Sequence, residues 1–234
     1  MTDDARHNLD LAANVDDLLA RVAAAAHVAG RRAEDVTVVA VSKMVNRTAV
    51  DAAVALGLRH FGENRVQDAN RKFAEPLPDG THLHLIGQLQ SNKAKPAVAL
   101  FNVIESVDRS SLIEALENAA VRRGEPLPVL LQVNIAHETQ KGGCDPDEAA
   151  RLMAQLVRSP ALLPMGLMTI APFVDDAEEV RPIFAGLRTL RDELQRRHPD
   201  VDLSRLSMGM SNDFAVAVAE GATWIRIGRA IFGE

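Results

Sequence analysis

Apolar residues recur along the chain in short runs that alternate with segments of helical periodicity. The candidate strands are VTVVAV (36–41), LRHFG (58–62), HLHLIG (82–87), FNVIES (101–106), VLLQVNI (129–135), MGLMTI (165–170), LSMGM (206–210) and TWIRIG (223–228). Most of these runs are apolar throughout, which is typical of strands that are covered on both faces. Helical spacing of apolar residues lies between them, at 47–57, 64–74, 91–99, 109–123, 146–158, 176–197 and 212–220.

A further amphipathic helix is predicted ahead of the first strand, over residues 9–30, with Gly30 as its stop. Strict alternation of strands and helices predicts parallel strands with helical crossovers. Eight such units close into a (β/α)8 TIM barrel, so we expect one α/β domain over residues 1–234. The chain ends soon after the last strand, and the N-terminal helix is expected to cover the place of a full eighth helix. An open doubly wound sheet is the alternative fold.

Composition narrows the functional classes. The chain is 47% hydrophobic and 25% charged, with a net charge of −6, so nothing draws it generally to nucleic acid or anionic membranes. Its apolar runs are too short to span a bilayer, and its acidic N-terminus does not resemble a secretory signal. The single cysteine, Cys144, cannot form an internal disulfide, which is typical of a cytoplasmic protein.

In a barrel of this kind the active site lies at the carboxyl ends of the strands. By alternation along the first strand, Lys43 shares a face with Val39 and Val41. In the last strand, Arg226 shares a face with Trp224 and is expected to point into the barrel. Closure makes these two strands neighbours, so Lys43 and Arg226 should converge at the barrel mouth. The polar residues that follow the strands are Lys43, Glu63, Asn64, Gln88, Ser106, Asp108, Asn134, His137, Thr169, Ser211, Asn212, Arg226, Gly228 and Arg229.

The last two loops have the composition of a phosphate site. Ser211 and Asn212 open the helix that follows the seventh strand, and Gly228 precedes Arg229 after the eighth. Loops at these positions recur as phosphate sites in barrel enzymes, where backbone N–H groups face the ligand. A phosphate-bearing ligand whose aldehyde carbon meets the Lys43 amine, forming a Schiff base, fits this pattern.

Ordered motifs along nearly the whole chain extend this interpretation. They are AVSKM (40–44), FGENRVQDA (61–69), HLIGQLQSNK (84–93), ESVDR (105–109), VNIAHETQKGG (133–143), GLMTIAP (166–172), LSMGMSND (206–213) and WIRIGRAIFG (224–233). With these motifs the chain resembles the pyridoxal-phosphate homeostasis proteins, which are single-domain relatives of the alanine racemase barrel.

The resemblance implies that Lys43 carries pyridoxal 5′-phosphate (PLP) as a Schiff base and that Arg226 lies against the pyridine nitrogen. It implies that Ser211, Gly228 and Arg229 hold the phosphate and that Asn64 sits near the ring. Members of the family are thought to bind and deliver PLP and to keep its free concentration, and the amino-acid and keto-acid pools, in balance, without an established catalytic activity. The partners it implies are PLP itself and PLP-dependent apoenzymes, and we expect a monomer.

Two enzymatic alternatives stay open at the level of sequence. One is a PLP-dependent amino-acid racemase, and the other is an aldolase that forms its Schiff base with a phosphorylated sugar. Alanine racemase uses a lysine and a tyrosine as opposed bases, and this chain contains no tyrosine. We therefore expect no robust racemase turnover.

Simpler interpretations apply to the same residues taken one at a time. A lysine that ends a strand is commonly solvated, and an arginine such as Arg226 can serve as a structural ion-pair partner. His82 and His84 share a strand face as metal ligands can, but no third ligand follows at a supporting spacing, so no metal site is predicted. Cys144 is interpreted as a structural thiol rather than a reactive one.

Overall fold

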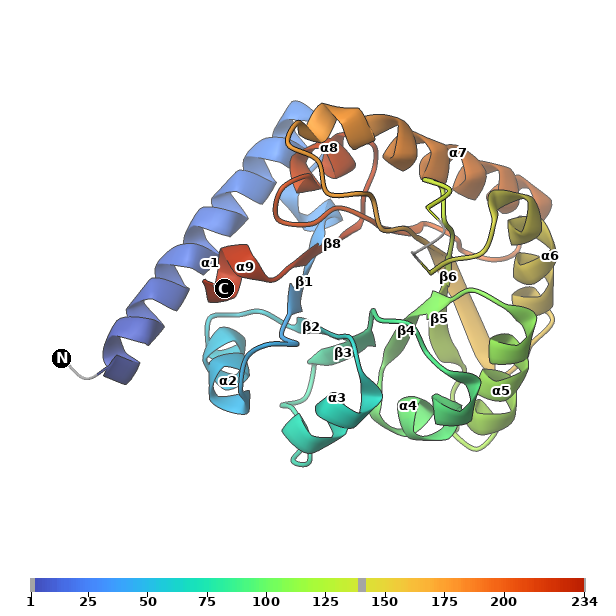
Figure 1. Ribbon diagram of the computed structural model, residues 1–234, viewed down its shortest axis with the longest axis horizontal. Helices are drawn as coiled ribbons and strands as arrows, with labels where there is room; N and C mark the ends of the chain where they lie inside the picture. Colours follow the sequence, from blue (N-terminus) through green and yellow to red (C-terminus); the bar gives the residue numbers. More distant parts are fainter. Residues whose placement is uncertain (1–2, 139–141, 234) are drawn as a thin grey trace.

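Eight parallel strands close into a barrel in chain order, as Figure 1 shows. The computed structural model describes residues 3–138 and 142–233. The strands are β1 (Thr37–Val41), β2 (His60–Glu63), β3 (His82–Leu85), β4 (Val103–Val107), β5 (Leu127–Gln132), β6 (Leu162–Met168), β7 (Arg205–Ser207) and β8 (Trp224–Ile227). The predicted (β/α)8 barrel is confirmed, and the open-sheet alternative is wrong.

Helices surround the barrel. The α-helices are α1 (Asp3–Val28), α2 (Arg47–Ala55), α3 (Val66–Lys72), α4 (Ala94–Leu100), α5 (Ser110–Ala120), α6 (Pro146–Val157), α7 (Arg181–Arg197), α8 (Phe214–Ala219) and α9 (Arg229–Phe232). Three 3₁₀ turns, η1 (Ala33–Asp35), η2 (Ser91–Lys93) and η3 (Ala177–Val180), precede β1, α4 and α7. The helix predicted over 176–197 is therefore divided, because Asp176 caps a separate 3₁₀ turn through the Glu178 N–H before α7 begins.

The N-terminal helix has the predicted place. Helix α1 lies across the outside of the barrel beside α8 and the short α9, close to the C-terminus (Figure 1). It buries one apolar stripe, which includes Leu11, Val15, Leu18 and Val22. Helix α9 spans only four residues, and α1 packs against it and against α8, where a full eighth helix would otherwise lie.

Closure depends on the pairing of the first and last strands. Strand β1 pairs with both β2 and β8, and Val39 stands opposite His60 on one side and Arg226 on the other. Ile225 and Ile227 join the apolar layer between strands and helices, whereas Trp224 packs inside the barrel. Arg226 alternates with the two isoleucines, so its predicted inward direction is confirmed.

The barrel interior combines a small apolar cluster with a chain of polar side chains. The apolar members are Val39, Val103, Leu130, Met168 and Trp224. The polar chain, which we call the interior chain, comprises His60, His84, Glu105, Ser207 and Arg226. His60 Nδ1 lies 2.9 Å from His84 Nε2, and His84 Nδ1 lies 2.6 Å from Glu105 Oε1. Ser207 Oγ then lies 2.5 Å from Glu105 Oε2 and 2.7 Å from an Arg226 nitrogen.

Two full charges are buried in this interior. Burial alone would raise the pKa of the Glu105 carboxyl, but hydrogen bonding from His84, together with the charge of Arg226, lowers it below its usual value. Burial lowers the pKa of the Arg226 guanidinium, and the charges of Glu105 and Asp213 oppose that effect. A guanidinium stays protonated in proteins, so the interior holds a carboxylate and a guanidinium joined through one hydroxyl group.

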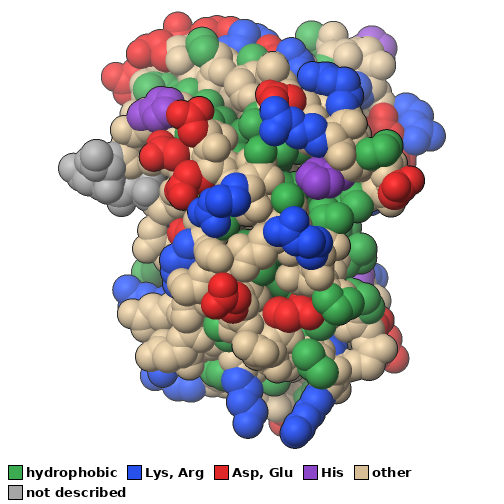
Figure 2. Space-filling view, turned by 90° about the vertical axis from the view of Figure 1, so that its right-hand side faces the viewer, with side chains coloured by type: hydrophobic (Ala, Val, Ile, Leu, Met, Phe, Trp, Pro, Cys, Tyr) green, Lys and Arg blue, Asp and Glu red, His purple; other side chains and the backbone are tan. Residues whose placement is uncertain are grey.

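The outer surface is polar. On the side of α6, Lys and Arg side chains are interspersed with Asp and Glu side chains rather than gathered into one continuous basic patch (Figure 2). Among the described residues, no helix combines the length and the apolar character needed to cross a bilayer.

Gly166 is a position where the barrel requires glycine. Its φ is +148°, and a Cβ there would lie 1.9 Å from the Arg205 carbonyl oxygen of the neighbouring strand. We expect Gly166→Ala to lower the free energy of unfolding by about 2–6 kcal/mol, because backbone strain and a backbone clash add together. Gly124→Ala is the control, since its φ of +90° adds strain without any neighbour within 4 Å. Urea unfolding followed by circular dichroism measures both; equal losses would contradict the clash.

His60 should make stability depend on pH. Burial, reinforced by the nearby His84 and His82, lowers the pKa of His60 to about 4. In the unfolded chain, where a histidine has a pKa of about 6.5, His60 binds a proton between about pH 6.5 and 4. In the native state it stays neutral over this range, so unfolding becomes more favourable as the pH falls. The free energy of unfolding should therefore fall by roughly 2 kcal/mol across this window.

The His60→Gln variant should lose this part of the pH dependence. The exposed His27 provides the matched control, and His27→Gln should leave the dependence intact. Chemical denaturation at pH 7, 6, 5 and 4 measures both variants against the parent. A parent curve that His60→Gln does not flatten would contradict the low pKa.

Candidate functional site

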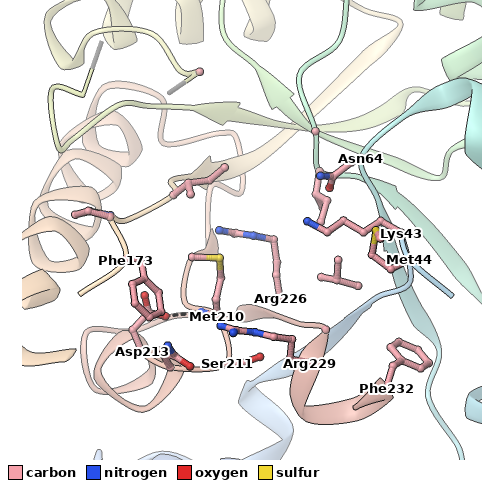
Figure 3. A pocket seen from close by; sticks show the side chains of 18 of the residues that line it. Lys43, Met44, Asn64, Phe173, Met210, Ser211, Asp213, Arg226, Arg229 and Phe232 are labelled. Atoms are coloured by element: carbon pink, nitrogen blue, oxygen red, sulfur yellow. Dashed lines mark hydrogen bonds between the residues drawn. The ribbon is translucent and has the colours of Figure 1, made fainter. Parts of the chain in front are cut away.

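A cavity of about 560 Å³ opens at the carboxyl ends of the strands. It is the place where barrels of this class bind ligands. All six residues predicted for the site contribute to its lining: Lys43, Asn64, Ser211, Arg226, Gly228 and Arg229. Figure 3 labels five of them around one hollow, with Lys43 and Asn64 on one side, Arg229 and Ser211 on another, and Arg226 between them. The structure thus brings the predicted residues together, while their roles toward a ligand stay predictions.

Lys43 stands two residues beyond β1 on a segment that is firmly held. The preceding residue, Ser42, is buried; its N–H donates to the Gly62 carbonyl at 3.0 Å and its hydroxyl to Glu63 Oε1 at 2.7 Å. Lys72 donates to the Ser42 carbonyl oxygen and, at 2.8 Å, to Glu63 Oε1. The backbone is therefore fixed on one side of Lys43, while the lysine side chain is exposed and directed into the cavity (Figure 3).

Arg226 forms the floor of the cavity. Its guanidinium is buried and donates to Ser207 Oγ and to the Thr169 carbonyl oxygen, both at 2.7 Å. A guanidinium has five N–H groups, so these two bonds leave further donors on a side chain that lines the cavity. Arg226 can therefore donate a hydrogen bond to a ligand but cannot accept a proton from one.

The third side is built from two turns. Gly209 adopts φ +92°, and a Cβ there would lie 2.6 Å from Ala217 Cβ, so only glycine allows the turn that leads to Ser211. The Asp213 carboxylate accepts from the Met210 N–H at 2.5 Å and closes this turn. Among the described residues, the N–H groups of Ser211 and Gly228 donate to no other group, which leaves them for a ligand.

The charge of the lining favours an anion. Lys43, Arg226 and Arg229 contribute three cations, against one carboxylate from Asp213. Neither Lys43 nor Arg229 forms an ion pair within the part of the chain that the structure describes. A phosphate would provide the counter-charge that these side chains otherwise obtain from solvent.

The lining also fits the other parts of PLP. Ile86, Ile170 and Met210 supply apolar surface for an aromatic ring, and the volume lies in the range of small-molecule pockets. The Lys43 amine suits an aldehyde, the Arg226 guanidinium suits a ring nitrogen, and the turn at Ser211 suits a phosphate. The residues present therefore fit the cofactor that the sequence implied.

Several of the polar residues that follow strands lie outside the lining. They are Glu63, Ser106, Asp108, Asn134, His137 and Thr169. Thr169 contributes only its backbone carbonyl, to Arg226. His137 is exposed, with φ +53°, and lies 3.6 Å from Asp145. Residues 139–141 of the predicted VNIAHETQKGG motif lie outside the described residues.

Cys144 has the surroundings of an inert thiol. It is buried, and burial together with the charges of Glu148 and Asp108 raises the pKa of its thiol to about 12. A thiol with this pKa is almost fully protonated at neutral pH and is a poor nucleophile. The interpretation of Cys144 as a structural residue agrees with this environment.

Sequence patterns missed the supports beneath the cavity. Glu105 and Ser207 lie on different strands and meet only when the barrel closes, and Lys72 reaches Ser42 from α3. The two histidines considered as metal ligands have other partners. His84 bonds to Glu105, and the His82 ring stacks on the His60 ring with 4.8 Å between their centroids. Within the described ranges, no three His, Cys, Asp or Glu side chains are arranged to hold a metal ion.

Comparison with known proteins extends these observations. The profile of the family described as "Alanine racemase, N-terminal domain" matches residues 14–234. The chain is 40% identical to the pyridoxal phosphate homeostasis protein of Aquifex aeolicus over 93% of this chain and 95% of that protein. It is 38% identical to the protein of the same name from Escherichia coli K12, over 96% of both chains.

A solved structure is similar over most of the barrel. It is PipY of Synechococcus elongatus PCC7942, solved with PLP bound, with 45% identity and a TM-score of 0.79. The match covers 85% of this chain and 93% of that one. From the profile, the identities and the shared barrel, the chain belongs to the pyridoxal phosphate homeostasis proteins, within the alanine racemase N-terminal domain family.

Proposed function

We propose that this protein binds PLP through a Schiff base on Lys43 and serves PLP homeostasis in the cytoplasm by holding and delivering the cofactor. One observation carries the proposal. An exposed amine and a buried guanidinium, on strands that meet at the closure of the barrel, face one cation-rich cavity. The relatives' name and the PLP bound to PipY support the same ligand.

The covalent step uses groups that the site provides. When bound, PLP would supply an aldehyde, and Lys43 is the residue that would hold it covalently, as a Schiff base formed with loss of one water molecule. Lys43 must present a neutral amine, and the rigid Ser42 segment holds its backbone in place. The bond is reversible by hydrolysis, which suits a protein that stores a cofactor and later releases it.

The noncovalent contacts divide the ligand between two ends of the cavity. Arg226, on the floor of the cavity, would donate a hydrogen bond to the ring nitrogen. Ser211, Gly228 and Arg229 would hold the phosphate through a hydroxyl, backbone N–H groups and a charge. Asn64 lies beside the ring next to Lys43, as Figure 3 shows for the side chains.

The residues of the lining argue against strong catalysis. Arg226 cannot protonate the ring nitrogen by exchanging a proton with it, so the ring remains a weak electron sink. A racemase also needs an acid–base group on the face opposite the lysine. Asp213 is the only carboxylate in the described lining, and it already accepts the Met210 N–H. We therefore propose a binding protein rather than a racemase.

Delivery requires an accessible mouth. Met44 and Phe173 both line the cavity, and they are 72% and 71% exposed. We propose that these apolar side chains are the contacts for PLP-dependent apoenzymes that receive the cofactor. The protein acts in this scheme as a monomer.

Lys43→Ala should remove covalent attachment of PLP without unfolding the barrel, because the side chain is exposed and outside the packed layers. Borohydride reduction followed by peptide mass spectrometry should label Lys43 in the parent. Lys95→Ala, an exposed lysine on α4, is the control and should label like the parent. Equal labelling of Lys43→Ala at another lysine would show that the assignment is wrong.

Arg229→Ala and Ser211→Ala should weaken retention of PLP by roughly tenfold to a hundredfold each, because a hydrogen bond to a charged group contributes about 1.5–3 kcal/mol. Pyridoxal, which lacks the phosphate, is the matched ligand and should bind both variants nearly as well as the parent. Quenching of the fluorescence of Trp224, the single tryptophan of the chain, measures the binding of both ligands. Equal losses for both ligands would contradict the phosphate assignment.

Alanine racemisation should be slow. Each missing general acid or base lowers a rate by a factor of about 10²–10⁴. PLP-loaded protein is incubated with L-alanine in deuterated water, and Cα exchange and D-alanine are followed together. Turnover of about 1–10³ s⁻¹ would support the racemase hypothesis and contradict the proposed homeostasis function. Covalent trapping of a phosphorylated sugar aldehyde in preference to PLP would instead favour the aldolase.

A further inference from the structure

We propose that Glu105 is a positioning residue, which holds the Arg226 guanidinium toward the cavity through the hydroxyl group of Ser207. The proposal rests on the proposed function, because the orientation of Arg226 affects binding only if Arg226 contacts the PLP ring as proposed above. It concerns residues that lie beneath the cavity and outside its lining.

The direction of every hydrogen bond at Ser207 is determined. A guanidinium only donates, so Arg226 donates to Ser207 Oγ at 2.7 Å. The single hydroxyl proton of Ser207 is then directed to Glu105 Oε2, at 2.5 Å. The Ser207 hydroxyl therefore links the carboxylate to the guanidinium by one donated and one accepted hydrogen bond. Only one orientation of its O–H bond satisfies both.

Glu105 is itself held from the opposite side. His84 Nδ1 lies 2.6 Å from Glu105 Oε1, and an ionised carboxylate can only accept, so His84 donates this bond. His60 Nδ1 lies 2.9 Å from the other nitrogen of His84 and fixes that ring in turn. Because both carboxylate oxygens are engaged, Glu105 cannot rotate away from Ser207.

The two charges depend on each other. Glu105 is 0% exposed and Arg226 is 4% exposed, so neither obtains its counter-charge from water. A buried ion whose partner is removed is strongly destabilised, whereas the satisfied pair is tolerated. The Thr169 carbonyl fixes a second nitrogen of Arg226 at 2.7 Å. The guanidinium is thus held at two points, and its remaining N–H groups face the cavity.

The interior chain does not conduct protons to the cavity. Both hydrogen bonds that link Arg226 to Glu105 through Ser207 are donated toward Glu105, the other bond of Arg226 goes to the Thr169 carbonyl oxygen, and a guanidinium does not release its proton at physiological pH. A relay to the ligand would need a group at this end that can both accept and donate. The chain consequently acts by position and charge alone, which separates the proposal from a general acid–base role.

The test uses variants that break the link at two different points. Glu105→Gln removes the charge at nearly constant shape, and Ser207→Ala removes the bridge while both charges stay. Glu220→Gln is the matched control: Glu220 is also a largely buried carboxylate, paired with Arg181 and Arg188 on the outside of the barrel. Arg226→Met, alone and combined with Glu105→Gln, completes a double-mutant cycle.

The first readout needs no cofactor. Nitrogen-15 NMR of the apo protein should show the Arg226 guanidinium N–H groups as slowly exchanging signals in the parent and in Glu220→Gln. These signals should be lost or broadened in Glu105→Gln and in Ser207→Ala. Because PLP is absent, this measurement decides the positioning role even if the protein proves not to bind PLP.

The second readout is PLP binding. Glu105→Gln should raise the dissociation constant of PLP roughly tenfold to a hundredfold, the value of one hydrogen bond to a charged group. In the Arg226→Met background the same change should have no further effect, because the residue through which Glu105 acts is gone. Binding of inorganic phosphate should stay at the parental level in Glu105→Gln.

Distinct results would overturn distinct claims. Unchanged Arg226 signals in both Glu105→Gln and Ser207→Ala would overturn the positioning role, as would an equal loss of PLP affinity with and without Arg226. Failure of Glu105→Gln to fold would leave Ser207→Ala to decide by the same criteria. A parent that shows the NMR signals but binds no PLP would defeat the proposed function and leave the positioning role standing.

Discussion

The burial of one guanidinium inside a closed barrel is the constraint on which the site depends. Arg226 is 4% exposed and is compensated by a carboxylate that it reaches through a single hydroxyl group. Removing a charge from water is costly, and only a well-placed counter-charge with its hydrogen bonds makes it tolerable. The interior chain supplies both, so the barrel presents a cation that is rigid before any ligand arrives.

Closure turns this constraint into a binding site. Pairing of β1 with β8 brings the end of the first strand beside Arg226, and the segment at Ser42 fixes the backbone next to Lys43. The turns that follow β7 and β8 add Ser211 and Arg229 at a third side of the same cavity. An amine, a buried guanidinium and a cationic turn are therefore held around one cavity, an arrangement that suits the proposed ligand with its aldehyde, pyridine and phosphate groups.

Local pattern in the sequence was sufficient to predict the barrel, because eight apolar runs alternate with helical segments. It was also sufficient to predict the direction of the two cations, Lys43 and Arg226. Alternation along the first and the last strand predicts which way Lys43 and Arg226 point, and closure of the barrel makes the two strands neighbours. The supports could not be predicted in this way. Glu105 and Ser207 belong to strands that do not pair, and their contact across the barrel interior has no period in the sequence. The division of the helix predicted over 176–197 has a different cause. The Asp176 side chain caps a separate 3₁₀ turn, which the apolar spacing does not reveal.

The protonation state of the bound ring nitrogen tests most directly whether Arg226 donates to it. PLP labelled with nitrogen-15 at the ring is bound to the protein, and its chemical shift is measured by solid-state or solution NMR. A guanidinium that keeps its protons and donates one hydrogen bond predicts the shift of an unprotonated, hydrogen-bonded pyridine. The shift of a pyridinium would show that another group protonates the ring, and would contradict the role given to Arg226.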